Sequence, residues 1–385
     1  MTKSRIRFAV AAFLLLVGVV LVCLPRAEPS YNGIQLSQWL DKGGPMAAFS
    51  LRISPEQETA IRHMGPDALP WLVNFIDAEP WFNSRRLLKI LRFSPKWAQT
   101  RWGGRLMQKA QENEFRSQAR AAAAANALRA LGAAARPALP RLLEIYRTRP
   151  DWIGAYRVPE VLAEFGPDVL PPVLAMMSDP GFSNKVSAIQ LIGRMRHLGT
   201  AAASAVPIVC DCLAQSDLSL QTASIDTLGA LHARADISVP ALVSALTNAV
   251  ESSNVVVSRK CAESLGQFDS AASNSVPDLC YALRCSDGIT SEEAARSLGR
   301  IRGLPDIAVP ALIEYFNAEN RRHCKYALEG LNGYGVVASP AAPLARQALA
   351  DPDHDTRALA ASFLQMLRQT NTAGVIPDAA AGFDR

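Results

Sequence analysis

The stretch AARSLGRIRGLPDIAVPALI, residues 294–313, carries the strongest indication of the fold. Small and apolar residues lead to Leu298-Gly299, and Pro310 follows inside a second apolar run. Glycine can take the left-handed conformation that ends a helix. Proline loses nothing at the start of a helix, where its missing N–H would have had no partner. The stretch therefore predicts a helix that ends at Gly299, a short turn, and a second helix that begins at Pro310.

The proline at the expected start of the second helix, here called the proline marker, recurs along most of the chain. It stands at Pro70, Pro140, Pro171, Pro207, Pro240, Pro277, Pro310 and Pro343. Successive markers lie 31 to 37 residues apart, except for one interval of 70 that spans two units. Leu-Gly pairs precede several markers, and each predicts the end of a first helix: Leu131-Gly132, Leu198-Gly199, Leu228-Gly229, Leu265-Gly266 and Leu298-Gly299. The chain is therefore an internal repeat of helix, turn and helix.

Two columns of apolar residues test this reading of the second helix. Two residues after the prolines stand Leu72, Leu142, Val173, Val209, Leu242, Leu279, Leu312 and Ala345. Six residues after them stand Ile76, Tyr146, Met177, Leu213, Leu246, Leu283, Phe316 and Leu349. Positions four apart share one helix face. Because a single pair of helices cannot cover that face, neighbouring units are expected to stack on it.

Stretches such as AARSLG at 294–299 and VPALI at 309–313 resemble HEAT repeats of the short bacterial kind, over residues 54–368. The resemblance implies an all-α fold, an α-solenoid in which about nine antiparallel helix pairs plus a terminal half-repeat form a right-handed superhelix. Tetratricopeptide and ankyrin repeats have similar periods. The first typically places its proline at the end of the unit, and the Thr-Pro-Leu-His signature of the second is absent.

The N-terminal region predicts a membrane anchor. Residues 8–24 are seventeen consecutive apolar residues, preceded by three basic residues within 1–7. This length is the minimum for a transmembrane helix, and the basic leading end favours a cytoplasmic N-terminus with the repeats outside the cytoplasm, in the periplasm if the protein is bacterial. The alternative is a cleaved signal peptide and a secreted protein. A linker with a short helix at 25–53 and a disordered tail at 369–385 complete the expected organisation.

A basic segment rich in tryptophan is the candidate binding surface. Residues 81–120 contain ten Lys/Arg, two Glu and three Trp, although the formal net charge of the whole chain is only +5. The candidate residues are Arg85, Arg86, Lys89, Arg92, Lys96, Trp97, Arg101, Trp102 and Arg105. Arginine and tryptophan are enriched at interface hot spots, and clustered cations attract anionic partners. The alternative is a solvated basic face with tryptophans that fill the core of an irregular repeat.

No motif in the sequence predicts catalysis, a metal or a cofactor. Cys210 and Cys212 occupy apolar columns of the repeat, which indicates core cysteines. The segment GYGVVA at 333–338 lacks the preceding strand of a dinucleotide site and predicts a helix-ending turn. DPDHD at 351–355 lacks the glycine and the glutamate of a calcium loop, so its aspartates are expected to cap the last helix.

These observations favour a membrane-tethered, non-enzymatic scaffold that binds a protein partner, with no nucleic acid expected. Two alternatives stay open. The first is binding of anionic glycan or lipid headgroups through residues 81–120. The second is an enzyme or nucleic-acid binder, because some HEAT-like folds process DNA bases or attach chromophores. An extracytoplasmic location argues against DNA.

Overall fold

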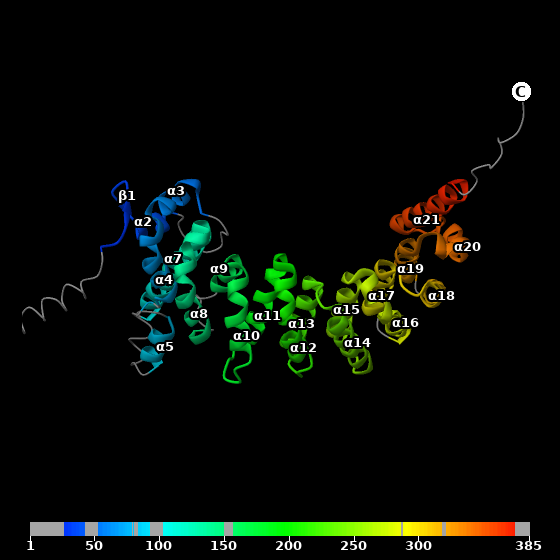
Figure 1. Cartoon of the computed structure of the whole chain (residues 1–385), viewed down its shortest axis with the longest axis horizontal. Helices are drawn as coiled ribbons and strands as arrows, with labels where there is room; N and C mark the ends of the chain where they lie inside the picture. Colours follow the sequence, from blue (N-terminus) through cyan, green and yellow to red (C-terminus); the bar gives the residue numbers. More distant parts are fainter. Residues whose placement is uncertain are drawn as a thin grey trace, which may run out of the picture. The chain divides into compact units, whose positions relative to one another are not determined.

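The computed structural model describes residues 27–42, 53–78, 80, 84–92, 103–149, 157–285, 288–317 and 321–373. They belong to two compact units, Met1–Glu164 and Phe165–Arg385. Nearly all of these residues are helical, and the sheet found among them has two strands (Figure 1). The expected anchor at 8–24 and the end of the expected tail, 374–385, lie outside the described residues. Within the described ranges, no helix has the length and apolar character needed to cross a bilayer.

The first unit begins with a small hairpin and continues with helices. Its elements are β1 (Ser30–Tyr31), β2 (Ile34–Gln35), α2 (Leu36–Asp41), α3 (Pro55–Met64), the 3-10 turn η2 (Gly65–Ala68), α4 (Leu69–Asp77), α5 (Ser84–Arg92), α7 (Gly104–Leu131), the 3-10 turn η4 (Gly132–Ala138), α8 (Leu139–Thr148) and α9 (Val158–Glu164). The strands pair antiparallel, Ser30 with Gln35 and Tyr31 with Ile34. Asn32 and Gly33 both have positive φ, as a two-residue hairpin turn requires.

A buried glutamine joins α2 to α3. The side chain of Ser54 accepts a hydrogen bond from the Gln57 N–H, and the Gln57 side chain accepts one from the Ser54 N–H, which is a capping box at the start of α3. Gln57 Nε2 also donates to the carbonyl of Trp39 at 2.7 Å. Gln57 and Trp39 are 4% and 6% exposed. One side chain therefore starts α3 and holds α2 against it.

The second unit is a regular succession of helices. Its elements are η6 (Gly166–Val169), α10 (Leu170–Met177), α11 (Lys185–Arg194), η7 (Met195–Ala205), α12 (Val206–Leu213), α13 (Leu218–Leu231), α14 (Ala235–Glu251), α15 (Val255–Gln267), η8 (Asp269–Ser275), α16 (Val276–Cys285), α17 (Gly288–Ile301), α18 (Pro305–Phe316), α19 (Arg321–Tyr334), η9 (Gly335–Ala341), α20 (Ala342–Ala348) and α21 (His354–Ala373). The elements named η are 3-10 turns, and α21 continues past Arg368, the last residue expected in the repeats.

Two layers of helices run through the second unit. The first helices of successive repeats, α11, α13, α15, α17, α19 and α21, contact one another in order. The second helices α12, α14, α16 and α18 do the same. Close antiparallel pairs also form between each second helix and the first helix of the next repeat, as in α14 with α15 and α16 with α17 (Figure 1). Each repeat therefore buries its apolar face against its neighbours.

The two predicted columns are buried, with one exception. Every residue of the first column is at most 1% exposed, and all but one of the second are at most 6% exposed. Leu349 is 44% exposed, because α20 is the last second helix among the described residues and ends before it, at Ala348. Each large side chain that is buried contributes about 1.5 to 3 kcal/mol to the stability of the fold.

The prolines mark helix starts in most repeats. Six are the second residue of their helix, where the absent N–H has no intrahelical partner: Pro70, Pro140, Pro171, Pro207, Pro277 and Pro343. Pro240 and Pro310 instead lie inside α14 and α18. These two helices begin five residues earlier, directly after Arg234 and Leu304, whose φ values are 48° and 43°. The left-handed conformation of Arg234 and of Leu304 completes the turn between helices, so that each second helix starts before its proline.

Three of the five predicted helix-ending glycines have a different role, so that part of the sequence analysis is wrong. Gly132 and Gly199 do have positive φ, as expected. Gly229, Gly266 and Gly299 lie within α13, α15 and α17, which continue past them. The space that a side chain would need there is occupied by the neighbouring first helix. A Cβ on Gly229 would lie 2.7 Å from Ser264 Oγ, and one on Gly299 would lie 2.8 Å from the Cα of Gly330.

Buried hydroxyl groups reinforce the same contacts. On α13, Thr227 Oγ1 donates to the carbonyl of Ile189 on α11 at 3.0 Å. On α15, Ser264 Oγ donates to the carbonyl of Ile225 on α13 at 3.1 Å. On α17, Ser297 Oγ donates to the carbonyl of Ala262 on α15 at 2.7 Å. Each hydroxyl therefore joins one first helix to the preceding one across a contact that glycine makes close.

Candidate functional site

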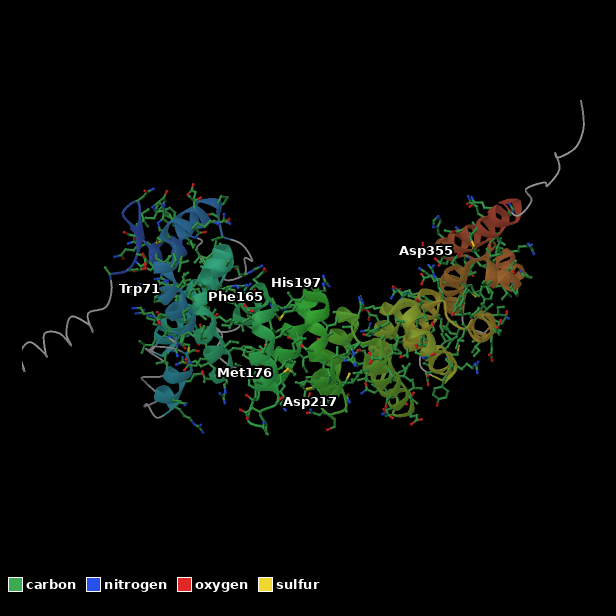
Figure 2. The ribbon with its side chains drawn as sticks, in the orientation of Figure 1. Trp71, Phe165, Met176, His197, Asp217 and Asp355 are labelled. Atoms are coloured by element: carbon green, nitrogen blue, oxygen red, sulfur yellow. The ribbon has the colours of Figure 1, made fainter. Side chains whose placement is uncertain are left out.

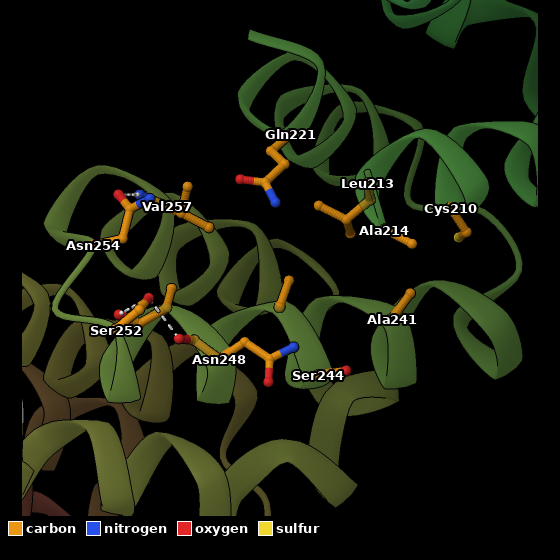
Figure 3. Close-up of a pocket in the computed structure, with 12 residues that line it drawn as sticks. Cys210, Leu213, Ala214, Gln221, Ala241, Ser244, Asn248, Ser252, Asn254 and Val257 are labelled. Carbon is orange, nitrogen blue, oxygen red and sulfur yellow. Dashed lines mark hydrogen bonds between the residues drawn. The ribbon is translucent and has the colours of Figure 1, made fainter. Parts of the chain in front are cut away.

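A groove opens in the second unit between α12, α13, α14 and α15 (Figure 3). Its volume is about 310 Å³. The lower wall is α14, which has 17 residues, whereas its neighbour α12 has 8. The last turns of α14 therefore extend past the end of α12 at Leu213 and leave one side of the groove without a second helix against it.

Small side chains deepen this groove. Ala241, Ala245 and Ala249 line it from α14, and their spacing of four places them on one face of that helix. Ala214, which follows the end of α12, lines it from the other side. A larger side chain at these alanines would occupy the space, so the groove results directly from their size.

Two primary amides face the groove without a partner among the described residues. Gln221 on α13 and Asn248 on α14 both line it, and Figure 3 shows their side chains directed into the space between the two helices. Neither side chain makes a hydrogen bond to another described residue. Asn254 is different, because its Oδ1 accepts from the Val257 N–H at 3.3 Å and caps α15. Ser252 Oγ donates to the Asn248 carbonyl at 2.7 Å.

The lining of the groove is uncharged. The residues that line it are apolar or neutral polar side chains. Cys210 is half-buried there, so the expectation of a core cysteine holds for the buried Cys212 and only in part for Cys210. Burial, and secondarily the nearby Asp211 carboxylate, raises the pKa of the Cys210 thiol to about 11. The thiol is therefore neutral at physiological pH and is a poor nucleophile or metal ligand.

The groove can bind a neutral ligand that both donates and accepts hydrogen bonds. Each primary amide offers two N–H donors and one carbonyl acceptor. A peptide main chain presents the same groups in alternation, and the alanines of α14 provide an apolar floor for small side chains. An ionic ligand would find no countercharge among the lining residues.

A second hollow, of about 730 Å³, lies over the first helices of the same unit. Its rim carries both signs of charge, including Arg196, Asp226, Glu263 and Arg300. Asp226 is already bound by Lys260 at 2.5 Å. Because the hollow carries both signs of charge and some of these charges already pair within the protein, its lining does not indicate one class of ligand.

The structure describes part of the candidate binding surface predicted in residues 81–120, and that part lies in the first unit. Lys89 and Arg92 on α5, and Arg105 in the first turn of α7, are exposed. Arg85 and Arg86 belong to α5, but their side chains are outside the description. Lys96, Trp97, Arg101 and Trp102 also lie outside the described residues. The structure therefore places five of the nine candidates on two helices that pack together and describes the side chains of three.

The two described tryptophans are not on that surface. Trp39 is buried in α2, its Nε1 donates to the Tyr31 carbonyl at 3.3 Å, and the Lys42 ammonium lies 3.5 Å from its ring centroid. Trp71 on α4 is half-buried beside Phe75, with ring centroids 6.4 Å apart (Figure 2). The three tryptophans of the segment 81–120 lie outside the described residues, so neither interpretation of them is tested.

The two motif-like segments near the C-terminus have the structural roles that the sequence predicts. Gly335 has a φ of 64° directly after α19, as in a helix-ending turn. Asp353 caps α21, because its Oδ2 accepts from the Thr356 N–H at 3.2 Å and from Thr356 Oγ1 at 2.8 Å. Among the described residues, no group of three or more His, Cys, Asp or Glu side chains could hold a metal ion.

The groove was missed by sequence reasoning. One signal was present in the sequence: Ala241, Ala245 and Ala249 form a column of small residues on one helix face. The other determinants, the early end of α12 and the late end of α14, are not encoded in the repeat pattern.

The fold defines a class of protein, the α-solenoids, in which stacked helical repeats share one core. Residues 239–332 match the family model of HEAT repeats. These residues are HEAT repeats, and the predicted resemblance to that family is confirmed.

Solved structures share the fold at low sequence identity. The karyopherin Kap121p bound to the SUMO protease Ulp1p matches with a TM-score of 0.51 and 13% identity, over 90% of this chain and 42% of that chain. Kap121p bound to Nup53p matches with a TM-score of 0.50 and 14% identity, over 86% of this chain and 41% of that chain. An engineered protein matches with a TM-score of 0.45 and 16% identity, over 86% of this chain and 98% of that one.

This chain thus spans less than half the length of the karyopherin, and the likeness shows the fold alone. No curated protein matches the sequence.

Proposed function

We propose that the chain is a non-enzymatic scaffold whose second unit binds a protein partner in the groove between α12 and α15. The observation that carries this proposal is the pair of amides of Gln221 and Asn248, which face an uncharged groove with no partner inside the described part of the protein. An extended segment of a partner would satisfy both amides through its main chain. The alanines of α14 would accommodate its small side chains.

The solved structures similar to this chain agree with such a role. Two of them are of a karyopherin bound to another protein, Ulp1p or Nup53p. The shared fold supports binding of a protein in general and carries no information on which protein this chain binds.

The proposal includes a membrane tether. Residues 8–24 form the anchor, the N-terminus is cytoplasmic, and the repeats lie on the other side of the membrane. A topology reporter fused after Arg385 tests this directly. Reporter activity outside the cytoplasm, in protein that stays in the membrane fraction, is the expected result. Activity in the cytoplasm would reverse the orientation, and release into solution would indicate a cleaved signal peptide.

Photo-crosslinking in native membranes tests the groove. Benzoylphenylalanine replaces Ser244, which is exposed and lines the groove, and in a matched control it replaces Gln347, which is exposed on α20. We expect a discrete protein adduct from position 244 only. Each amide contributes about 1 kcal/mol through its hydrogen bonds. Adding Gln221→Ala and Asn248→Ala should therefore weaken binding, and reduce the adduct at subsaturating partner, by roughly thirtyfold.

Two results would contradict the proposal. Equal adducts from positions 244 and 347 would indicate non-specific collision. An adduct from position 244 that is unchanged by the two alanine substitutions would show that the amides do not hold the partner.

A further inference from the structure

A second surface lies on the first unit, on α5 and the first half of α7. Its residues are Lys89, Arg92, Arg105, Lys109 and Arg116, and we call them the basic surface. All five are exposed, and the two helices that carry them pack against each other. The segment SRRLLKILR of α5 contains no acidic residue. The surface is therefore a concentration of positive charge in one part of the molecule.

The charges of the basic surface are not neutralised within the described structure. None of its five cations has a described carboxylate within ion-pair distance. The two glutamates of this half of α7 are hydrogen-bonded to neutral groups: Glu114 accepts from Ser84 Oγ at 2.7 Å, and Glu112 accepts from Gln108 Nε2 at 3.1 Å. Arg120, one turn beyond the surface, shows the contrast, because its Nε donates to Asp41 at 3.0 Å. The free cations are available to an external anion.

Leucines stand exposed among these cations. On α5, Leu87 is buried at 4% exposure, whereas the next residue, Leu88, is 56% exposed. Leu106 on α7 is 37% exposed and follows Arg105. A surface that only binds a hydrated polyanion does not need exposed leucine. A helix that lies on a lipid bilayer combines cations, which contact the headgroups, with apolar side chains that enter the boundary of the acyl chains.

We infer that the basic surface binds the anionic phospholipid headgroups of the bilayer that holds the anchor. The inference rests on the tether of the proposed function, and the order of the chain supports it. The elements described between the expected anchor and α5 are the hairpin, α2, α3, η2 and α4. The cations gain energy close to an anionic leaflet, and this gain falls off within a Debye length. Leu88 and Leu106 add contact with lipid.

Hydrogen exchange on reconstituted protein tests this surface. The full chain is placed in nanodiscs of phosphatidylcholine and in nanodiscs of equal parts phosphatidylcholine and phosphatidylglycerol. We expect the α5 amides to exchange roughly tenfold more slowly with phosphatidylglycerol. The protection should shrink in about 0.5 M salt, where the Debye length is about 4 Å.

Three sets of substitutions assign the effect to residues. Lys89→Gln, Arg92→Gln, Arg105→Gln and Lys109→Gln together should abolish the protection. The matched control is Arg302→Gln with Arg346→Gln, two exposed arginines of the second unit, and it should keep the protection in full. Leu88→Ser with Leu106→Ser should weaken it. Exchange of α4, which packs against α7 in the first unit, reports whether the variants of that unit are folded, and exchange of α15 does so for the control. If the quadruple variant is not folded, Arg105→Gln and Lys109→Gln are tested singly.

Two outcomes would overturn the inference. Equal exchange of α5 in the two lipids would show that the surface does not sense anionic headgroups. Protection produced by soluble dextran sulfate, and unchanged by the two leucine substitutions, would assign the surface to polyanions such as glycans. Failure of the anchor is visible separately, as protein that does not migrate with phosphatidylcholine nanodiscs. The comparison of the two lipids remains valid in that case, because the protein can still bind from solution.

Discussion

Ser264 on α15 lies directly against the backbone of Gly229 on α13, so that a Cβ on the glycine would be 2.7 Å from the serine Oγ. The same hydroxyl donates to the carbonyl of Ile225, one turn earlier on α13. The pattern repeats along the array, with Thr227 against Gly193 and Ser297 against Gly266. At these three contacts, close approach of the first helices combines glycine on one helix with a small hydroxyl residue on the next.

Gly229→Ala should destabilise the second unit. The added methyl group would meet Ser264 and Gln267, and such overpacking costs about 1–3 kcal/mol. Chemical denaturation followed by circular dichroism measures the loss. Gly288→Ala is the control, because no atom lies within 4 Å of its Cβ position and the substitution stiffens the unfolded chain. Equal stability of the Gly229→Ala and Gly288→Ala variants would contradict the packing described.

Ala245→Leu should be tolerated, because the new side chain enters the groove of about 310 Å³. We expect a cost below about 1 kcal/mol. Ala295→Leu is the comparison. Ala295 is fully buried in α17, and the same enlargement there should cost about 1–3 kcal/mol. Melting temperatures of the two variants provide the measurement, and a larger loss for Ala245→Leu would show that the groove is closed in solution.

Gln57→Leu should loosen α2 from α3. The substitution leaves the buried carbonyl of Trp39 without its donor and removes half of the capping box. An unsatisfied buried group costs about 1–3 kcal/mol. Hydrogen exchange of α2 should increase, and Trp39 fluorescence should shift toward that of exposed tryptophan. Gln111→Leu, at an exposed position of α7, is expected to change stability by less than about 0.5 kcal/mol.

Cys210 should be slow to alkylate at neutral pH. Its thiol has a pKa raised to about 11, so only about one molecule in a thousand is a thiolate at about pH 8. The folded state binds the thiol proton more tightly than the unfolded state does. The rate of alkylation of the folded protein should therefore rise about tenfold per pH unit until about pH 11. In the unfolded protein the rise should stop near the ordinary value of about 8.5. Mass spectrometry of the Cys210 peptide after iodoacetamide treatment follows both profiles, and a folded-state plateau near pH 9 would refute the burial.

The repeat and its core could be predicted from the sequence because they depend on local, repeated signals. Leu242 and Leu279 hold the same place after their prolines, and both are fully buried. The role of Gly229 could not be predicted from the Leu-Gly pair alone. A helix-ending glycine and a helix-packing glycine look alike in that pair. The distinguishing signal is a hydroxyl residue two positions earlier, Thr227 or Ser264, which lies against the glycine of the preceding repeat.

The candidate surfaces were predictable to different degrees. The charge of α5 is evident in the sequence, and the exposure of Lys89 and Arg92 agrees with a charged face. The groove depends on the extension of α14 to Glu251, beyond the end of α12 at Leu213. The repeated prolines mark where second helices lie but do not specify where they end. The position of the groove could therefore not be predicted from the repeat.

The pairing of α14 with α15 determines where the array can be divided. A chain cut after Ser252 would keep α14 but lose the helix that covers it, and Leu246 would become exposed to water. A cut after His232 would remove both helices together and leave α12 covered by α13. Chimaeras joined at His232, and arrays shortened there, should therefore stay soluble. Chimaeras joined or arrays shortened at Ser252 should aggregate.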